Sequence, residues 1–144
     1  MEDRYLFKAK DCNSIWRAGL LIALQEDRCA IEESDGSKWA CDARTLCQCT
    51  GLKDKNGKLI WENDIVKKEF YTDYDNCANS EEYIGIAKIM DCAWVIETIR
   101  GRKCTRTIFD VMSYSEEVKH FEVIGNIFDN PELLESEEQY GENI

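Results

Sequence analysis

Three acidic residues lie close together near the centre of the sequence: Asp54, Glu62 and Asp64. Carboxylate oxygens are the ligands that magnesium and calcium prefer, so this trio could gather a divalent cation for carboxylate-metal catalysis. The competing interpretation is that Asp54 and Asp64 cap turns and bond backbone amides, as aspartate at a turn ordinarily does. We favour the second interpretation and predict no metal here.

The chain contains a single histidine, His120, which narrows the hydrolytic and metal-site chemistry open to it. A Cys–His dyad would have to use His120, and no nucleophile motif accompanies it. The sequence has neither a G-x-x-x-x-G-K-[ST] phosphate loop nor a G-x-G-x-x-G run. We therefore predict a protein that is not an enzyme and that uses no cofactor.

Eight cysteines raise the question of compartment. The opening MEDRYLFK is not a basic segment followed by an apolar core, and no run approaches the roughly 20 apolar residues of a membrane span. We expect a cytoplasmic protein without membrane contact, in which thiols stay reduced. Cys47 and Cys49 form the only close pair, and C-x-x-C is absent, so zinc is not expected. Most cysteines should be small buried hydrophobic residues.

The chain is strongly acidic, with a net charge of −11. The charge is uneven, because residues 71–82 hold four acidic residues and no basic one. An acidic chain repels a phosphate backbone, so a nucleic-acid partner is not expected. The acidity suits either solubility or binding to a basic protein surface.

The acidic trio sits inside Gln48–Val66, which has the pattern of turn, strand, turn and strand. Asn56-Gly57 predicts a hairpin with a type I′ turn, because both residues tolerate positive φ. Leu59–Trp61 then begins an extended segment. Asn63-Asp64 predicts a second tight turn or a bulge.

Turn signals recur about every eight to twelve residues along the chain, which favours hairpins over βαβ units. We predict a mainly β fold of one or more small barrels built from hairpins, with a partly SH3-like pattern and a short helix starting near Pro131. Gly19 is expected at a bulge or a close backbone contact. Tyr83–Ile89 and Ala93–Glu97 predict a β-hairpin, and Ser115–Lys119 predicts a single helical turn. Asn130 is expected to cap the helix that starts near Pro131. A single domain over residues 1–144 is predicted; the alternative is two lobes, with hairpins in 1–47 and a barrel plus helix in 48–144.

Two further features each have two interpretations. The polar segment Glu69–Glu82 predicts a long surface loop, whose Tyr71 and Tyr74 either contact a partner or fold back over the barrel end. Trp61 is either a core residue beneath the hairpin, which we favour, or the wall of a small pocket with Glu62.

Three stretches resemble the YopX family, small proteins of temperate phages and prophages of Gram-positive bacteria. TGLKDKNGKLIWENDIV at Thr50–Val66 is similar to the family signature. RYLFKAKDCNSIWRAGLLIAL at Arg4–Leu24 is similar to its opening strands, and FEVIGNIFDNPELL at Phe121–Leu134 to its closing motif. The resemblance implies a mainly β fold and carries no activity across residue by residue.

We therefore expect a non-enzymatic phage or prophage accessory protein in the cytoplasm of the bacterial host. It would bind a host protein or sequester a small signal molecule, in a host-interaction or anti-defence role. The candidate binding residues are Asp54, Asn56, Trp61, Glu62, Asp64, Tyr71 and Tyr74.

Two alternatives stay open. The first is a single-stranded nucleic-acid module, because small barrels often bind single strands by stacking. Its footprint would be Trp94 with the basic residues Arg100, Arg102, Lys103 and Arg106. The second is the carboxylate-metal enzyme that would use the acidic trio.

The last expectation concerns assembly. The run Gly19–Leu24 is longer and more apolar than one alternating strand face requires, so both faces of this strand should be covered. We expect a homo-oligomer, most simply a symmetric dimer. On this basis Leu21→Glu should change the assembled mass.

Overall fold

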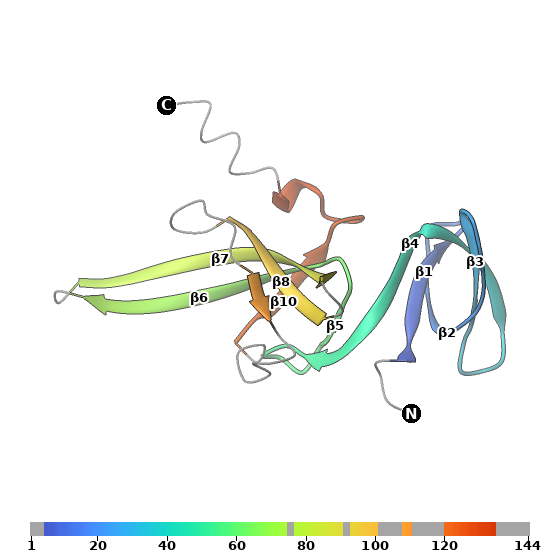
Figure 1. The fold of residues 1–144 in the computed structure, drawn as a ribbon, viewed down its shortest axis with the longest axis horizontal. Coiled ribbons are helices and arrows are strands. Elements are labelled where there is room, and N and C mark those ends of the chain that lie inside the picture. Colours follow the sequence, from blue (N-terminus) through green and yellow to red (C-terminus); the bar gives the residue numbers. More distant parts are fainter. Residues whose placement is uncertain (1–4, 75–76, 91–92, 101–107, 111–119, 135–144) are drawn as a thin grey trace. The chain divides into compact units, whose positions relative to one another are not determined.

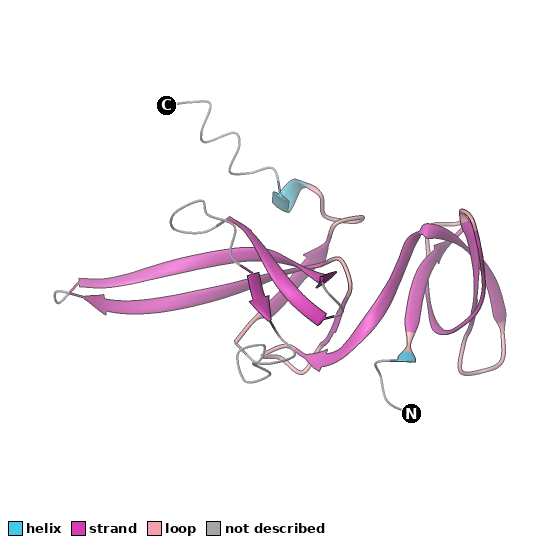
Figure 2. Ribbon diagram, viewed as in Figure 1, coloured by secondary structure: helices cyan, strands magenta, loops and turns pink. Residues whose placement is uncertain are grey.

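Strands predominate among the described residues, which confirms the mainly β prediction (Figure 2). The computed structural model describes residues 5–74, 77–90, 93–100, 108–110 and 120–134, with side chains for 5–68, 83–89, 93–97 and 120–134. The strands form two five-stranded sheets. By its contacts the chain divides into two compact units, Met1–Leu52 and Lys53–Ile144.

The first unit is a ring of four strands (Figure 1). Each strand pairs antiparallel with the next, and the last returns to pair with the first. Ring closure therefore places the first and third strands on opposite sides of the second. In chain order the strands are β1 (Phe7–Asp11), β2 (Trp16–Gln25), β3 (Arg28–Glu32) and β4 (Lys38–Lys53).

The interior of this ring holds a small core. Its buried members are Ala9, Cys29, Ile31 and Cys41. Ile31 is the one large side chain among these four, and the other three are small because a ring of few strands encloses little volume. Arg17, the cross-strand neighbour of Ala9, stacks on the core-packing Trp39 with its guanidinium carbon 3.4 Å from the ring centroid.

Gly19 lies where β2 meets β3, and the predicted close backbone contact is confirmed. A Cβ atom at this position would collide with the carbonyl oxygen of Glu32 and would approach the Cα of Glu33 within 3.1 Å. The neighbouring atoms belong to the backbone, so they cannot rotate away. Glycine is therefore required for the two strands to approach each other this closely.

The second unit contains the open sheet, in the order β10-β6-β7-β8-β9. Its buried side chains include Ile60, Ile65, Val66, Ile84, Ile96 and Phe121. The short strand β5 pairs with β4 instead. The strands are β5 (Leu59–Trp61), β6 (Asp64–Tyr74), β7 (Cys77–Met90), β8 (Ala93–Arg100), β9 (Ile108–Asp110) and β10 (Glu122–Asn126).

The prediction of a long loop over Glu69–Glu82 is wrong. β6 and β7 continue through this segment and pair without a register shift from Ile65 with Ile86 to Tyr74 with Cys77. Aromatic and β-branched residues favour extended backbone, and Phe70-Tyr71-Thr72 supplies three of them. The segment has no alternating pattern because the neighbouring strands β8 and β10 do not reach it, so no core imposes one.

Two other predicted elements are present. The hairpin expected over residues 83–97 is formed by β7 and β8, with Met90 opposite Ala93. The short C-terminal helix follows Pro131 and is described as one turn at 132–134. Asn130 was expected to cap it, but its Oδ1 accepts the amide of Asn126 at 3.2 Å instead. The helical turn predicted at 115–119 lies outside the described residues.

Candidate functional site

The turn at Asp54 is organised by the aspartate side chain. Its Oδ1 accepts the backbone amides of Asn56 at 2.8 Å and Lys58 at 2.9 Å, and the Asp54 amide donates to the Lys58 carbonyl at 2.8 Å. Only Gly57 has a positive φ, of 79°, in this turn. The prediction of a type I′ turn is therefore wrong, because such a turn needs positive φ at both central residues. The turn is instead a three-residue loop that ends at Gly57 in the left-handed conformation. The hydrogen bond from the Asn56 amide to the Asp54 carboxylate is compatible with a negative φ at Asn56.

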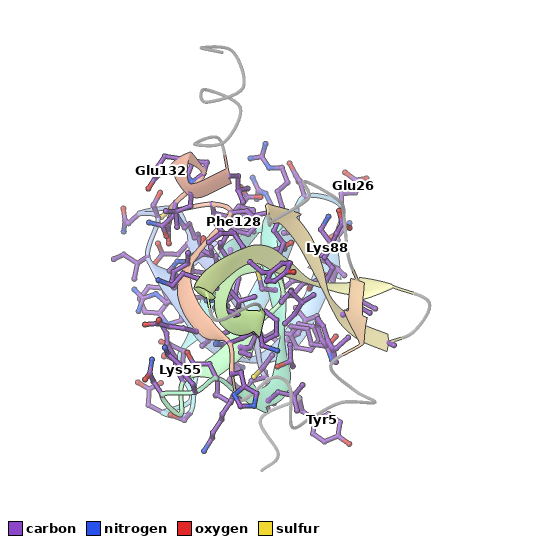
Figure 3. All side chains as sticks on the ribbon, turned by 90° about the vertical axis from the view of Figure 1, so that its left-hand side faces the viewer. Tyr5, Glu26, Lys55, Lys88, Phe128 and Glu132 are labelled. Atoms are coloured by element: carbon purple, nitrogen blue, oxygen red, sulfur yellow. The ribbon has the colours of Figure 1, made fainter. Side chains whose placement is uncertain are left out.

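The same carboxylate also reaches a strand far along the chain. Asp54 Oδ2 accepts the amide of Val123 at 2.9 Å, and the Lys55 amide donates to the carbonyl of Phe121 at 2.9 Å. Lys55, labelled in Figure 3, has a partly exposed side chain. Its Nζ lies 3.5 Å from a carboxylate oxygen of Glu122. Burial works to raise the pKa of Asp54, but the three amide hydrogen bonds outweigh it and hold that pKa below its ordinary value.

An equivalent turn occurs in the first unit. Asp11 Oδ1 accepts the amides of Asn13 and Ile15 at 2.8 and 3.0 Å, and Ser14 takes the left-handed position with φ 62°. Asp11 Oδ2 receives Arg17 Nε at 2.9 Å. Sequence reasoning missed this equivalence, although the shared spacing D-x-N-[SG] was visible in both segments.

The second turn of the central segment lies between β5 and β6, as predicted. Asn63 has φ 71°, and its amide donates to the Ala87 carbonyl at 2.8 Å while its carbonyl accepts Ile127 N–H at 3.1 Å. Asp64 Oδ2 accepts the amide of Trp61 at 2.8 Å. The turn therefore joins β7 to the segment after β10.

The predicted binding residues lie in two places, at the turns that flank β5 and in the outer part of β6. Asp54 and Asp64 are buried and bond backbone amides. Trp61 and Glu62 are half-buried beside them, and neither contributes to the surface hollow described below. Tyr74 stands at the far end of β6, roughly 30 Å of extended chain from Asp64. In the part of the chain that the structure describes, no group of three His, Cys, Asp or Glu is placed to hold a metal ion.

Two surfaces stand out instead. The first is a two-stranded arm, defined here as residues 69–74 of β6 and 77–82 of β7. β10 pairs with β6 only over Asp64–Lys67, and β8 pairs with β7 only over Ile84–Met90. Tyr71 and Tyr74 lie in this arm, opposite Ser80 and Cys77. The sequence from Glu69 to Glu82 contains five acidic residues and no basic one.

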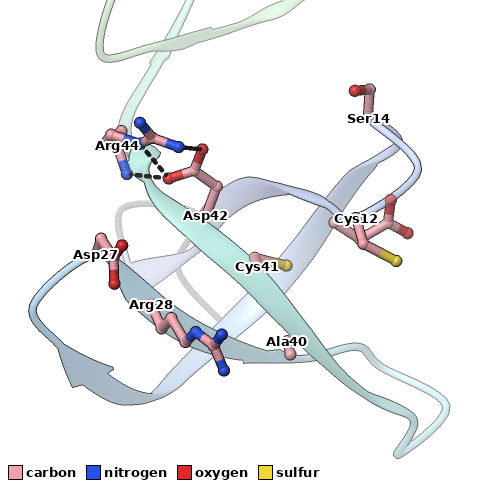
Figure 4. A pocket seen from close by; sticks show the side chains of 9 residues that line it. Cys12, Ser14, Asp27, Arg28, Ala40, Cys41, Asp42 and Arg44 are labelled. Carbon is pink, nitrogen blue, oxygen red and sulfur yellow. Dashed lines mark hydrogen bonds and ion pairs between the residues drawn. The ribbon is translucent and has the colours of Figure 1, made fainter.

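The second surface is a hollow of about 530 Å³ on the first unit (Figure 4). Arg44 is tied to Asp42 by two side-chain contacts of 3.0 Å, so this pair is largely self-neutralised. Burial raises the pKa of Cys41 to about 11, which leaves its thiol protonated and poorly nucleophilic at neutral pH. The residues that line the hollow are Asp11, Cys12, Ser14, Asp27, Arg28, Ala40, Cys41, Asp42 and Arg44.

Of the footprint expected for nucleic acid, the structure describes the side chain of Trp94 and the backbone of Arg100. Trp94 is 9% exposed, so its ring cannot act as a stacking platform. Arg100 ends β8, and Arg102, Lys103 and Arg106 lie outside the described residues.

Comparison with known protein families identifies the family of this chain. A family model described as YopX protein matches residues 6–135. The chain belongs to the YopX family. The match spans both the Asp54 turn of this YopX chain and the strand β10 that it bonds. None of the curated proteins compared with the sequence matches it. Within its described residues, this YopX chain has no helix long and apolar enough to span a membrane.

Proposed function

We propose that this protein is a non-enzymatic accessory protein of a temperate phage or prophage that binds a host protein through its acidic arm. The observation that carries the proposal is the continuous β6–β7 pairing, which extends seven residue pairs beyond Lys67 to Tyr74 with Cys77. No other described strand pairs with that extension.

The arm's physical properties favour a partner. A two-stranded ribbon on its own is marginally stable in water, so an added contact surface would stabilise it. Its register sets Glu69 opposite Glu82, and like charges directly opposite each other destabilise a strand pair. A basic partner would remove that repulsion, so we propose a positively charged protein surface as its binding site.

The absence of enzyme activity is part of the proposal. Asp54 and Asp64, the carboxylates best spaced to hold a metal, are occupied by the amides of Val123, Lys58, Asn56 and Trp61. Coordination of a cation by either carboxylate would break these hydrogen bonds to backbone amides. This favours binding over the carboxylate-metal alternative. The buried Trp94 and the net charge of −11 likewise favour a protein partner over a single-stranded nucleic acid.

A second candidate function is sequestration of a small signal molecule in the hollow of the first unit. Its volume of about 530 Å³ falls within the range of small-molecule sites, roughly 300–1,000 Å³. Arg28 and Ser14 offer donors there, and Asp27 offers an acceptor (Figure 4). A ligand with both anionic and cationic groups would suit this lining.

Affinity capture from host lysate would test the proposal with three baits. They are the wild-type chain, an arm variant (Asp73→Asn, Asp75→Asn, Glu81→Gln) and a control variant (Glu32→Gln, Asp35→Asn, Glu132→Gln). We expect the same basic protein on the wild-type and control baits and its loss from the arm variant. Equal capture by all three would contradict binding through the arm. A small molecule released from every bait would favour the hollow instead.

A further inference from the structure

The second half of β2 is a strand edge without a neighbour. β1 pairs with β2 only over Trp16–Gly19. β3 pairs with β2 over Leu20–Gln25, with a register shift between Leu21 and Ala23. Since β1 and β3 lie on opposite sides of β2, the β1 side of Leu20–Gln25 faces no strand in the part of the chain that the structure describes. The backbone N–H and C=O groups of this stretch that point to the β1 side are therefore open to pairing.

This edge is also apolar and uncharged. Leu20, Ile22 and Leu24 are 40%, 44% and 59% exposed, although large hydrophobic side chains are normally buried. The run Ala18–Leu24 contains no charged residue, whereas 33% of the whole chain is charged. An open edge with exposed apolar side chains is the usual starting point for strand pairing between chains.

We propose that the occupant of this edge is a second copy of the same chain, whose Leu20–Gln25 pairs antiparallel with the first. Antiparallel pairing of identical strands is two-fold symmetric, so one edge serves both copies and the assembly closes as a dimer. Two chains of net charge −11 repel each other, and contact is favoured where neither carries charge. The seven-residue uncharged run meets that requirement.

Charges at the ends of the edge complement each other in this arrangement. β1 begins beside Gly19, so the antiparallel partner strand ends against the start of β1. The turn after that strand carries Glu26 and Asp27, both exposed. Lys8 lies in β1 opposite Ala18. The acidic turn of each copy therefore comes next to a lysine of the other.

The sequence suggested Leu21 as the position for testing assembly, but Leu21 is not among the exposed residues of this edge. Leu21 is half-buried and packs against the core of the ring, so Leu21→Glu would disturb folding as well as assembly. Ile22 and Leu24 are exposed and are better positions for a test. Ile89 of β7, 45% exposed in the other unit, provides a control of the same chemistry.

Light scattering of the full chain at about 50 μM and below tests the dimer. We expect twice the chain mass of 16.7 kDa for the wild type and for Ile89→Lys, and the single mass for Ile22→Lys/Leu24→Lys. Circular dichroism establishes that the double variant keeps its strands. A wild-type monomer at this concentration, or a dimer that survives the double substitution, would overturn the proposal.

A second experiment locates the contact without weakening it. A benzophenone amino acid placed at Leu20 or at Ile89 is irradiated in the otherwise unchanged chain. We expect a covalent dimer from position 20 and none from position 89, with the crosslinked peptide lying within residues 18–27. A dimer crosslinked only from position 89 would overturn the proposal, even if the wild-type mass is that of a dimer.

Discussion

The carboxylate of Asp54 accepts the backbone amide of Val123 at 2.9 Å across a separation of 69 residues. This bond joins the central turn of the family signature to the strand β10 near the end of the described chain. Two further hydrogen bonds, between Lys55 and Phe121 and between Asn63 and Ile127, also connect this polar segment to residues 121–127. These bonds hold the second unit together. The most chemically suggestive residues of the sequence thus hold the fold.

Replacing Asp54 with asparagine should destabilise the second unit. The side-chain oxygen of the new asparagine can still accept the amides of Asn56 and Lys58. The side-chain NH₂ group would then face the Val123 amide, and two donors cannot form a hydrogen bond. Loss of a charge-assisted hydrogen bond costs about 2 kcal/mol. Urea unfolding followed by fluorescence should show a decrease of that size, and Asp35→Asn in an exposed turn should show little change.

The effect of Asp54 should depend on pH. The pKa of this carboxyl is lowered by folding, so its contribution is present above the unfolded pKa of about 3.9 and is lost as the pH falls through the folded value. The difference in unfolding free energy between wild type and Asp54→Asn should therefore shrink on acidification. A difference that stays constant from pH 7 to pH 3 would contradict this role.

Gly19→Ala should be more damaging than a typical glycine substitution in this protein. The added methyl would collide with the Glu32 carbonyl oxygen, so β2 and β3 would have to separate, at a cost of about 1–3 kcal/mol. Gly36→Ala provides the comparison, because its Cβ meets open space and only its φ of 88° is unfavourable, which costs about 1 kcal/mol. Thermal unfolding that ranked Gly36→Ala as the worse variant would exclude the close contact at Gly19.

Cysteine reactivity should separate exposed thiols from buried ones. Cys12 is exposed, whereas Cys29, Cys41, Cys47 and Cys49 are buried. Burial also raises the pKa values of Cys29 and Cys41, so their thiolate fractions at pH 8 are small. Brief alkylation of native protein, read by peptide mass spectrometry, should modify Cys12 ahead of these four. Equal labelling of Cys41 and Cys12 would contradict the ring core.

Local signals predicted much of the fold, because they act over a few residues. The Asn63-Asp64 turn, the β7–β8 hairpin and the helix after Pro131 each depend on residues adjacent in sequence. The close contact between the backbone of Gly19 and that of Glu32 was predictable for the same reason, because glycine has no Cβ atom to prevent it.

Long-range relationships were not predictable from local patterns. Nothing near Asp54 indicates that its second oxygen bonds Val123, and nothing near Lys8 indicates that β4 returns to close a ring. The arm was mistaken for a loop because its polar residues lack the alternation that a buried face imposes. The hollow of the first unit combines residues from three separate segments, so sequence spacing could not reveal it.

The most direct test of the arm's role is the affinity of the captured host protein for the three baits, measured by titration calorimetry at two salt concentrations. We predict that the arm variant (Asp73→Asn, Asp75→Asn, Glu81→Gln) binds about tenfold or more weakly than wild type, that the control variant stays within about twofold, and that added salt weakens wild-type binding most. Equal dissociation constants for the wild type and the arm variant would contradict the account.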